Sequence, residues 1–296
     1  MSNYDNYPSS LYPFLSEGSF RSICHYIYDD YHTLQPSEVQ RANSIIYIKN
    51  ELRYIENFFK NIIPRITHNV IIITCGTIPS YPGQFRKCLE HPKLIAWFAK
   101  NNTLFGHPKM HSLPLGCLNR YQENHLDIVK KNYMTDPQKI MHDMFHKEKS
   151  ETYFVNFNKC AYRDRSRYKA EEVLQKYGYP NLSFTNMQNY MENVKSHKFV
   201  ISPLGSGYDC YRHWESMYMG TIPITTSSPI DMQFKNLPII ILNSWDDFTP
   251  EKIVREYNKL YDNRDKIEWE KLFCPYWFNK IHECQTIGMD NPTKYL

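Results

Sequence analysis

The sequence predicts an α/β protein in which strands and helices alternate to build two successive parallel sheets. Short apolar runs, of which 69–74 is the clearest, have the continuous hydrophobicity of strands that are covered on both faces. Segments with apolar residues at helical spacing separate these runs. No internal repeat or low-complexity tract favours another architecture.

The first half of the chain opens with a proline- and tyrosine-rich stretch and then alternates between the two element types. The helix expected from 51 to 62 has a helical period, with apolar residues at positions 52, 55, 58, 59 and 62. The expected strands of this half are 44–48, 69–74 and 109–113, and its expected helices are 22–31, 51–62 and 93–99.

The second half repeats the alternation after the polar, charged segment 133–150, which we expect to connect two domains. Its best helix-start signal is Thr249, a predicted N-cap, followed by Pro250 at the first helical position. The expected strands are 151–158, 199–201, 221–225 and 237–242, and the expected helices are 165–176, 185–196, 209–220, 249–261 and 269–284.

Composition argues against several classes of protein. Lys and Arg number 35 against 31 Asp and Glu, a net charge of +4 that is too balanced for a dedicated nucleic-acid binder. No signal peptide or membrane span is expected from the sequence. The eight cysteines are scattered and contain no C-x-x-C pair, so we expect them to be reduced thiols. We therefore expect a soluble, cytoplasmic protein. The frequent Asn, Ile, Lys and Tyr fit an AT-rich, viral source, in which case the compartment is the host cytoplasm.

The stretch 199–231 predicts an anion site between a strand and a helix. Pro203 ends the strand, and a loop with two glycines follows it. Asp209 is the predicted N-cap of a helix that runs to Gly220. Free N–H groups and the helix dipole converge at such a helix start. The loop residues expected to bind the anion are Ser202, Gly205, Ser206 and Gly207.

The predicted helix carries two charged residues three positions apart, Arg212 and Glu215, which share one helix face. The guanidinium of Arg212 suits a diphosphate, and the carboxylate of Glu215 can accept hydrogen bonds from a ribose diol. The alternative is a solvated ion pair within the helix. The preceding glycine loop favours the binding interpretation.

A longer motif covers this stretch. SPLGSGYDCYRHWESMYMGTIPI, followed by SSPID, matches the pattern S-P-x-G-x-G-x-D-C-H-R-x-W-E, then G-x-I-P-I and S-P-x-D. In these residues the chain resembles exostosin-like glycosyltransferases and the related ribitol-xylosyltransferase-type proteins of animals and large algal viruses. Tyr211 stands where the pattern usually has His, so the chain lacks that imidazole. The matching positions are Ser202, Pro203, Gly205, Gly207, Asp209, Cys210, Arg212, Trp214, Glu215, Gly220, Ile222, Pro223, Ser228, Pro229 and Asp231.

The first half also resembles this family, in the segment LIAWFAKNN and the following HPKMHSLPLGCLNR. The acceptor domain of the virus and xylosyltransferase branch has a W-F-x-x-N helix before a strand and a P-x-G turn. Both halves therefore resemble one family, from about residue 44 to 270. The residues that carry the match in the first half are Trp97, Phe98, Asn101, Pro114 and Gly116.

The resemblance implies a fold of the GT-B type, with two Rossmann-like domains and a cleft between them. The expected domains are 1–140 for the acceptor and 141–275 for the nucleotide-sugar donor, with a helix in 276–296 that crosses back to the first domain. The implied activity is an inverting transfer of xylose from UDP-xylose to a glycan or glycoprotein. UDP-glucuronic acid, galactose and N-acetylglucosamine remain alternative donors. No D-x-D occurs, so we expect a metal-independent enzyme without a cofactor.

A second cation for the phosphates is expected in VNFNKCAYRDRSRYKA, where the family has an arginine near the start of the next helix. Arg165 is the first choice and Arg167 the second, with Arg163 and Lys159 nearby. A solvated basic turn is the alternative. Asp209 is expected either to cap its helix or to touch substrate, and Asp231 either to shape a turn or to contact the donor.

The sequence offers several candidates for the general base. Related sequences often carry Asp in the loop after the second strand, but here that loop is Cys75-Gly76-Thr77-Ile78. Glu51, just after the first strand, is the first substitute, and the base can also have been lost. The other possible bases are Glu17, Asp30 and His107. The spacing of His107, His111, Cys274, His282 and Cys284 matches no usual zinc site.

Two other functions compete with a transferase. A catalytically inactive nucleotide-sugar-binding protein would account for the missing loop carboxylate. A dinucleotide oxidoreductase would require the G-x-G-x-x-G motif, but position 210 is Cys where that motif has its third glycine.

Overall fold

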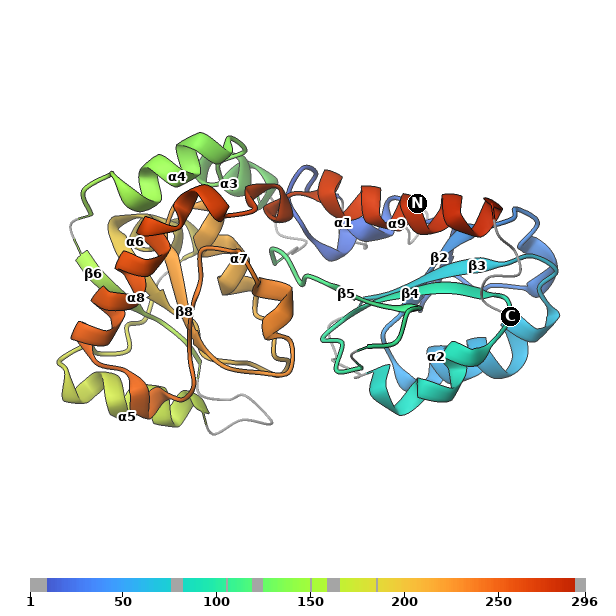
Figure 1. The fold of residues 1–296 in the computed structure, drawn as a ribbon, viewed down its shortest axis with the longest axis horizontal. Helices are drawn as coiled ribbons and strands as arrows, with labels where there is room; N and C mark the ends of the chain where they lie inside the picture. Colours follow the sequence, from blue (N-terminus) through green and yellow to red (C-terminus); the bar gives the residue numbers. More distant parts are fainter. Residues whose placement is uncertain are drawn as a thin grey trace. The chain divides into compact units, whose positions relative to one another are not determined.

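The computed structural model describes residues 10–75, 82–104, 106–118, 125–149, 151–158, 166–184 and 186–290. It is an α/β protein with two parallel sheets, of five and four strands, as the sequence predicted (Figure 1). The chain divides into two compact units, the first formed by Met1–Leu115 with Phe273–Leu296 and the second by Gly116–Leu272.

The sheet of the first unit consists of parallel strands whose spatial order is their order in the chain. Its inner strands are apolar on both faces because helices cover both of them. The strands are β1 (Tyr26–Tyr28), β2 (Ser44–Lys49), β3 (Val70–Cys75), β4 (Leu94–Lys100) and β5 (Met110–Leu113).

Two groups of helices cover this sheet, one on each face (Figure 1). The first group packs on Ile46, Ile48 and Ile72, and the second lies on the Tyr47 side of the sheet. The first group is α2 (Leu52–Asn57), η3 (Phe58–Ile62), η4 (Ile63–Arg65) and η5 (Pro82–Glu90), and the second is α1 (Glu17–Arg21) and α9 (Cys274–Asp290). The turn η2 (Pro36–Glu38) contacts η4.

Two predicted helices of the first unit were wrong. The segment predicted as a helix at 93–99 is the strand β4, whose seven residues are all buried. The segment 22–31 contains β1 instead of a helix, and α1 ends before it. A short apolar run such as LIAWFAK has no periodicity that separates a buried strand from a buried helix.

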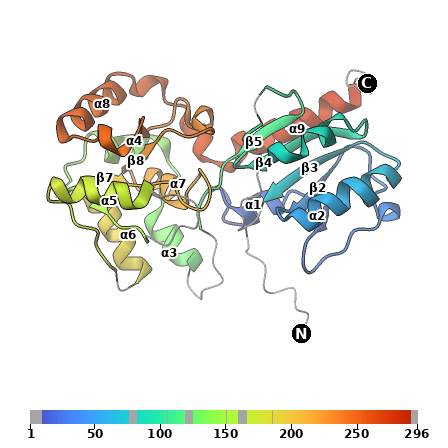
Figure 2. The ribbon, with the colours of Figure 1, turned by 90° about the horizontal axis from the view of Figure 1, so that it is seen from below.

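The second unit has its own parallel sheet, in the order β6 (Glu151–Val155), β7 (His197–Ile201), β8 (Ile222–Thr226) and β9 (Ile240–Leu242). Adjacent residues of β6 point to opposite faces. Tyr153 stacks on Phe199, whose ring contacts Tyr257 of α8 (Pro250–Asp262), whereas Phe154 contacts Tyr190 of α6 (Met187–Ser196). Figure 2 shows α8 and α6 on opposite sides of the strands.

The remaining elements of the second unit connect or flank these strands. Thr249 caps α8 as predicted, because its side chain accepts a hydrogen bond from the Lys252 amide at 3.1 Å. The other elements are α3 (His125–Asn132), α4 (Pro137–Phe145), α5 (Ser166–Lys176), α7 (Tyr211–Tyr218), η6 (Asp231–Phe234), η7 (Trp245–Asp247), η8 (Arg264–Lys266) and η9 (Trp269–Leu272).

The segment 133–150, expected as a connection between domains, is part of the second unit and contains α4. The Met134 amide donates a hydrogen bond to the Tyr218 carbonyl at 2.9 Å, and the rings of Tyr133 and Tyr218 stack at 5.4 Å. The first boundary between the units therefore lies near residue 115, not near 140. The helix α9 belongs to the first unit, where the Cys274 amide donates to the Pro13 carbonyl at 2.9 Å.

Both described sheets keep the strand order of the chain, which is the order within one half of a doubly wound sheet. The C-terminal ends of all strands in a sheet consequently share one edge, where the loops that can carry a ligand site emerge. Among the helices that the structure describes, none combines the length and hydrophobicity that crossing a lipid bilayer requires.

Candidate functional site

The predicted anion site is a folded loop between β7 and α7 at the C-terminal edge of the second sheet. The Gly205 amide donates to the Gly207 carbonyl at 3.1 Å, and the Cys210 thiol donates to the Pro203 carbonyl at 3.5 Å. These contacts close the loop on itself. Ser206 is exposed at its tip, whereas Ser202 is fully buried below it.

Arg167 of α5 joins this loop to the chain that follows β6. Its Nε donates to the Leu204 carbonyl at 2.9 Å, and its Nη1 donates to the Asn158 carbonyl at 2.5 Å. A Cβ atom added to Gly205 would lie 3.0 Å from Nη2 of Arg167, so a side chain at this position would require the guanidinium to shift by a few tenths of an ångström. The other predicted cations, Arg165, Arg163 and Lys159, lie outside the described residues.

Arg212 lies in the first turn of α7, directly after the loop. Its Nε is buried and has no hydrogen-bond partner among the described residues. Burial raises the pKa of the Cys210 thiol to about 11, and the guanidinium groups of Arg212 and Arg167 both oppose that shift. The two arginines predicted from separate motifs thus both lie near the Cys210 thiol, beside the glycine loop.

Tyr190 of α6 is a neighbour of Arg212 that the sequence did not reveal. Burial raises the pKa of its phenol to about 12, an effect that Arg212 opposes and Glu215 reinforces. Glu215 is buried, and its Oε1 accepts a hydrogen bond from the Leu118 amide at 3.1 Å. Glu215 therefore anchors the backbone at 118, a role that the predicted ribose contact did not consider.

Asp209 is not the N-cap of the helix, because α7 begins one residue later and its N-cap is Cys210. The Asp209 carboxylate is buried, and it accepts hydrogen bonds from Trp214 Nε1 at 2.9 Å and from Gln233 Nε2 at 2.8 Å. These bonds tie α7 to η6. The buried position and these partners give Asp209 a structural role below the loop.

His213 completes this buried layer, and sequence reasoning missed it. Its ring is fully buried and lies 3.3 Å from the Cys210 amide through Nδ1 and 3.2 Å from the Ser202 carbonyl through Nε2. When Nδ1 accepts from Cys210, Nε2 carries the proton and donates to Ser202. The available signal was the position of His213, three residues after the N-cap Cys210, where a polar side chain completes a capping box.

Asp231 shapes the turn after β8. Its carboxylate accepts from the hydroxyl of Ser227 at 2.6 Å and from the Ser228 amide at 2.8 Å. Of the two interpretations of Asp231, these contacts favour the structural turn. Its contact with a donor stays a prediction.

In the first unit, Glu51 is the N-cap residue of α2, at the end of β2. Its carboxylate pairs with Lys49 at 2.5 Å and with Arg53 at 3.1 Å. Hydrogen bonds from Lys49 and Tyr54 lower the pKa of the neighbouring Asp30, which also pairs with Arg53 at 2.7 Å. Glu51 and Asp30 thus share the cations Lys49 and Arg53 in one cluster of ion pairs.

In the part of the chain that the structure describes, no group of three or more His, Cys, Asp or Glu side chains could hold a metal ion. His107 lies 3.4 Å from Glu90 and His111 stacks on Phe98, so these two imidazoles have separate surroundings. The loop 76–78, expected to replace the usual carboxylate, lies outside the described residues.

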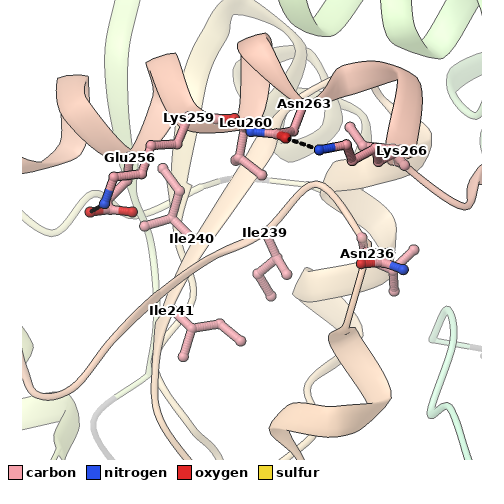
Figure 3. Close-up of a pocket in the computed structure, with 11 residues that line it drawn as sticks. Asn236, Ile239, Ile240, Ile241, Glu256, Lys259, Leu260, Asn263 and Lys266 are labelled. Atoms are coloured by element: carbon pink, nitrogen blue, oxygen red, sulfur yellow. Dashed lines mark hydrogen bonds and ion pairs between the residues drawn. The ribbon is translucent and has the colours of Figure 1, made fainter.

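A cavity of about 330 Å³ lies elsewhere in the second unit, between β9 and α8 (Figure 3). Its lining includes Asn236 and Leu237, which precede β9, so it extends to the N-terminal end of that strand. It contains none of the residues predicted to bind a donor. Its lining residues are Asn236, Leu237, Ile239, Ile240, Ile241, Glu256, Lys259, Leu260, Asn263, Lys266 and Ile267.

No protein-family model matches the chain, and no curated protein sequence matches it either. Its function must therefore be inferred from the motif residues and from the geometry around the glycine loop.

Proposed function

We propose that this protein is a UDP-sugar-dependent glycosyltransferase of the GT-B type, whose donor site is the glycine loop between β7 and α7. The observation that carries the proposal is the position of Arg167 and Arg212 on that loop, at the start of a helix. Guanidinium groups and free N–H groups together suit a diphosphate. The match of this stretch to the family motif supports the same assignment.

The buried Nε of Arg212 adds a specific argument. Buried N–H groups without a partner are rare in folded proteins, and those found in native structures call for a reason. A phosphate oxygen beside the loop would accept this hydrogen bond. Such a bond strengthens as negative charge develops on the leaving diphosphate, so Arg212 would favour the transition state over the bound substrate.

The other residues of the loop would position the donor. Gly205 and Gly207 let the phosphates approach the backbone closely, and Arg167 fixes the loop through the Leu204 carbonyl. The buried layer of Asp209 and His213 keeps the start of α7 rigid below them. This electrostatic scheme neutralises the leaving group without requiring a metal ion.

UDP-xylose is the proposed donor sugar, and a glycan or glycoprotein is the proposed acceptor, because the motif resembles that of xylosyltransferase-type proteins. UDP-glucuronic acid, UDP-galactose and UDP-N-acetylglucosamine are the alternatives. A calorimetric titration tests the donor class directly. We expect UDP to bind and NAD not to bind, and UDP-xylose to release UDP in the presence of EDTA.

An inactive nucleotide-sugar-binding protein is the second candidate, and one observation favours it. The carboxylate of Glu51, the base proposed from the sequence, is engaged by both Lys49 and Arg53. Tight UDP binding without release of UDP from any of the four nucleotide sugars would support this candidate over the transferase.

A further inference from the structure

The glycine loop begins at Ser202, directly after β7, and ends at Cys210, directly before α7. Inside the loop, the Gly205 amide donates to the Gly207 carbonyl at 3.1 Å, and the Cys210 thiol donates to the Pro203 carbonyl at 3.5 Å. Glycines leave such a backbone many conformations. Backbone N–H groups stabilise a diphosphate best when they already point at it before the donor binds. The loop therefore depends on support from side chains outside it.

Side chains from neighbouring helices supply this support. Arg167 donates to the Leu204 carbonyl at 2.9 Å, near the start of the loop. His213 of α7 contacts both ends, because its Nδ1 accepts a hydrogen bond from the Cys210 amide at 3.3 Å and its Nε2 lies 3.2 Å from the Ser202 carbonyl. A neutral imidazole that accepts at Nδ1 carries its proton on Nε2, so it donates to Ser202. One ring thus joins the end of the loop to its beginning.

The ring of His213 is itself fixed in place. It is fully buried and packs edge to face with Phe234 of η6, with 5.3 Å between the ring centroids. Asp209 Oδ1 lies 3.3 Å from Nδ1, and the Asp209 carboxylate accepts hydrogen bonds from Trp214 and Gln233. A close-packed ring with these neighbours cannot turn without losing contacts. The positions of both loop ends are therefore set by α7 and η6.

The hydrogen bond from the Cys210 amide also concerns Arg212. Cys210 is the N-cap of α7, and Arg212 lies in the first turn of that helix. The free N–H groups of this turn and the Arg212 guanidinium are the groups proposed to bind the diphosphate. A displaced N-cap would displace these donors, and a small displacement of a positioned group removes much of its effect.

His213 is not the histidine of the family motif. The motif has its histidine at the position of Tyr211 and no fixed residue at the position of His213. Successive residues of an α-helix are turned by about 100°, so these two positions are about 200° apart around the helix. Tyr211 is accordingly half-buried, whereas His213 is fully buried. The contact of His213 with both loop ends is therefore a feature of this chain that the motif does not include.

We propose that His213 is a positioning residue of the donor site, which holds both ends of the glycine loop so that the loop N–H groups and Arg212 converge on the diphosphate. This assignment rests on the proposed transferase function and adds a residue to the same site. The side chain of His213 is fully buried, so it acts through the loop and not by touching the donor. Donor affinity is consequently the quantity that reports its role.

The test compares two replacements of His213. His213→Leu keeps a side chain in the buried space but loses both contacts with the loop. His213→Gln restores them, because Gln at the third helical position can accept from the N-cap amide through its oxygen and donate through its NH₂ group. The affinity of each folded variant for UDP is measured by calorimetry. We expect His213→Leu to bind UDP at least about tenfold more weakly than wild type, and His213→Gln to stay within about threefold.

A control variant separates positioning from stability. Thr221 is fully buried just before β8, at the opposite end of the sheet from the glycine loop, and its hydroxyl donates to the Val194 carbonyl at 2.8 Å. Thr221→Val removes this hydrogen bond with little change of shape, so it should lower the melting temperature, as His213→Leu does. Its UDP affinity should stay within about twofold of wild type. A merely structural His213 would give the same result as Thr221→Val.

A further variant decides the case in which His213→Leu does not fold. His213→Asn has a shorter amide, which can accept from the Cys210 amide but cannot also extend to the Ser202 carbonyl. We expect His213→Asn to bind UDP at least about threefold more weakly than His213→Gln. Equal affinities of these two variants overturn the role of His213.

The remaining results also support or overturn the assignment. Weaker UDP binding by His213→Leu that His213→Gln restores, with normal binding by Thr221→Val, supports it. UDP affinity of folded His213→Leu within about threefold of wild type overturns the role of His213 and leaves the proposed function intact. An equal loss of affinity in Thr221→Val overturns it too, because the loss then follows stability. Wild-type protein that does not bind UDP overturns the proposed function itself, and the role of His213 with it, before any variant is made.

Discussion

Each of the two units contains its own parallel sheet, whose strands follow the order of the chain. The charged side chains at the C-terminal edges of the two sheets differ. In the second unit that edge presents two guanidinium groups, of Arg167 and Arg212, around a glycine loop. In the first unit it carries carboxylates, each of which is paired with a cation. The edge of the second sheet is cationic at this loop, whereas the edge of the first sheet combines carboxylates with cations. Similar sheets thus carry different side chains at the ends of their strands, where functional sites are built on a fold.

The largest expected effect comes from removing the Arg212 guanidinium at the C-terminal edge of the second sheet. Arg212→Ala should reduce turnover about 100-fold, equivalent to about 2–3 kcal/mol of transition-state stabilisation, with little loss of stability. Arg212→Lys keeps the positive charge but loses the planar guanidinium with its paired N–H donors, and it should therefore recover only part of the activity. Steady-state kinetics and thermal unfolding check both variants. Near-normal turnover of Arg212→Ala would remove Arg212 from the diphosphate role.

A second comparison contrasts the buried carboxylate of one unit with the exposed carboxylate of the other. Asp209→Asn should cost about 2 kcal/mol in the free energy of unfolding, because its amide cannot accept from both Trp214 and Gln233 without loss. Asp30→Asn should cost less than about 1 kcal/mol, since its ion pairs are exposed. Denaturant titration measures both. An equal loss of unfolding free energy in the two variants would contradict the structural role of Asp209.

The approach of Arg167 to the glycine loop can be tested without touching a charge. Gly205→Ala places a methyl group where Nη2 of Arg167 would be 3.0 Å away, so the guanidinium must move. We expect UDP affinity to fall about tenfold, equal to about 1.4 kcal/mol, with a small change in stability. Gln175→Ala, at an exposed position of α5, is the control and should leave affinity unchanged. Equal affinities of the two variants would show that the space at Gly205 is not needed.

The smallest expected effect concerns a lysine remote from either edge. Burial, and then the neighbouring Lys147, lower the pKa of Lys149 to about 8. A lysine whose folded pKa is depressed costs stability while it is protonated, and the cost disappears as the pH rises from 8 towards 10.5. Lys149→Met should therefore stabilise the protein at pH 7 by on the order of 1 kcal/mol, and less at pH 9.5. A gain in stability of Lys149→Met that is the same at pH 7 and pH 9.5 would show that it does not come from the charge of Lys149.

The sequence predicted most elements wherever a local signal was present. The start of α8 was correct because Thr249 and Pro250 form a local cap. The prediction of a helix at β4 was wrong, because the apolar run LIAWFAK shows neither a helical nor a strand periodicity. The segment forms a strand because it pairs with β3 and β5. Segment 133–150 looked like a polar linker, but buried residues such as Tyr133 attach it to the second unit.

The candidate site was predicted to a similar extent. The glycine loop and Arg212 were visible because a strand, a loop and a helix start follow one another in the chain. The contacts of Asp209 with Gln233 and of Tyr47 with Glu17 join residues 24 and 30 positions apart, and no local pattern predicts them. The predicted donor contacts of Ser206, Gly207, Glu215 and Asp231 stay predictions.

By itself, the sequence determined the alternation of strands and helices, the glycine loop before a helix start and the motif that suggests a sugar transferase. These features depend on short-range spacing, which one-dimensional reasoning captures. Only the tertiary structure decided which carboxylates are buried, paired or accessible at a sheet edge. Burial and pairing depend on chain segments that meet only after folding, as Glu17 and Lys100 do.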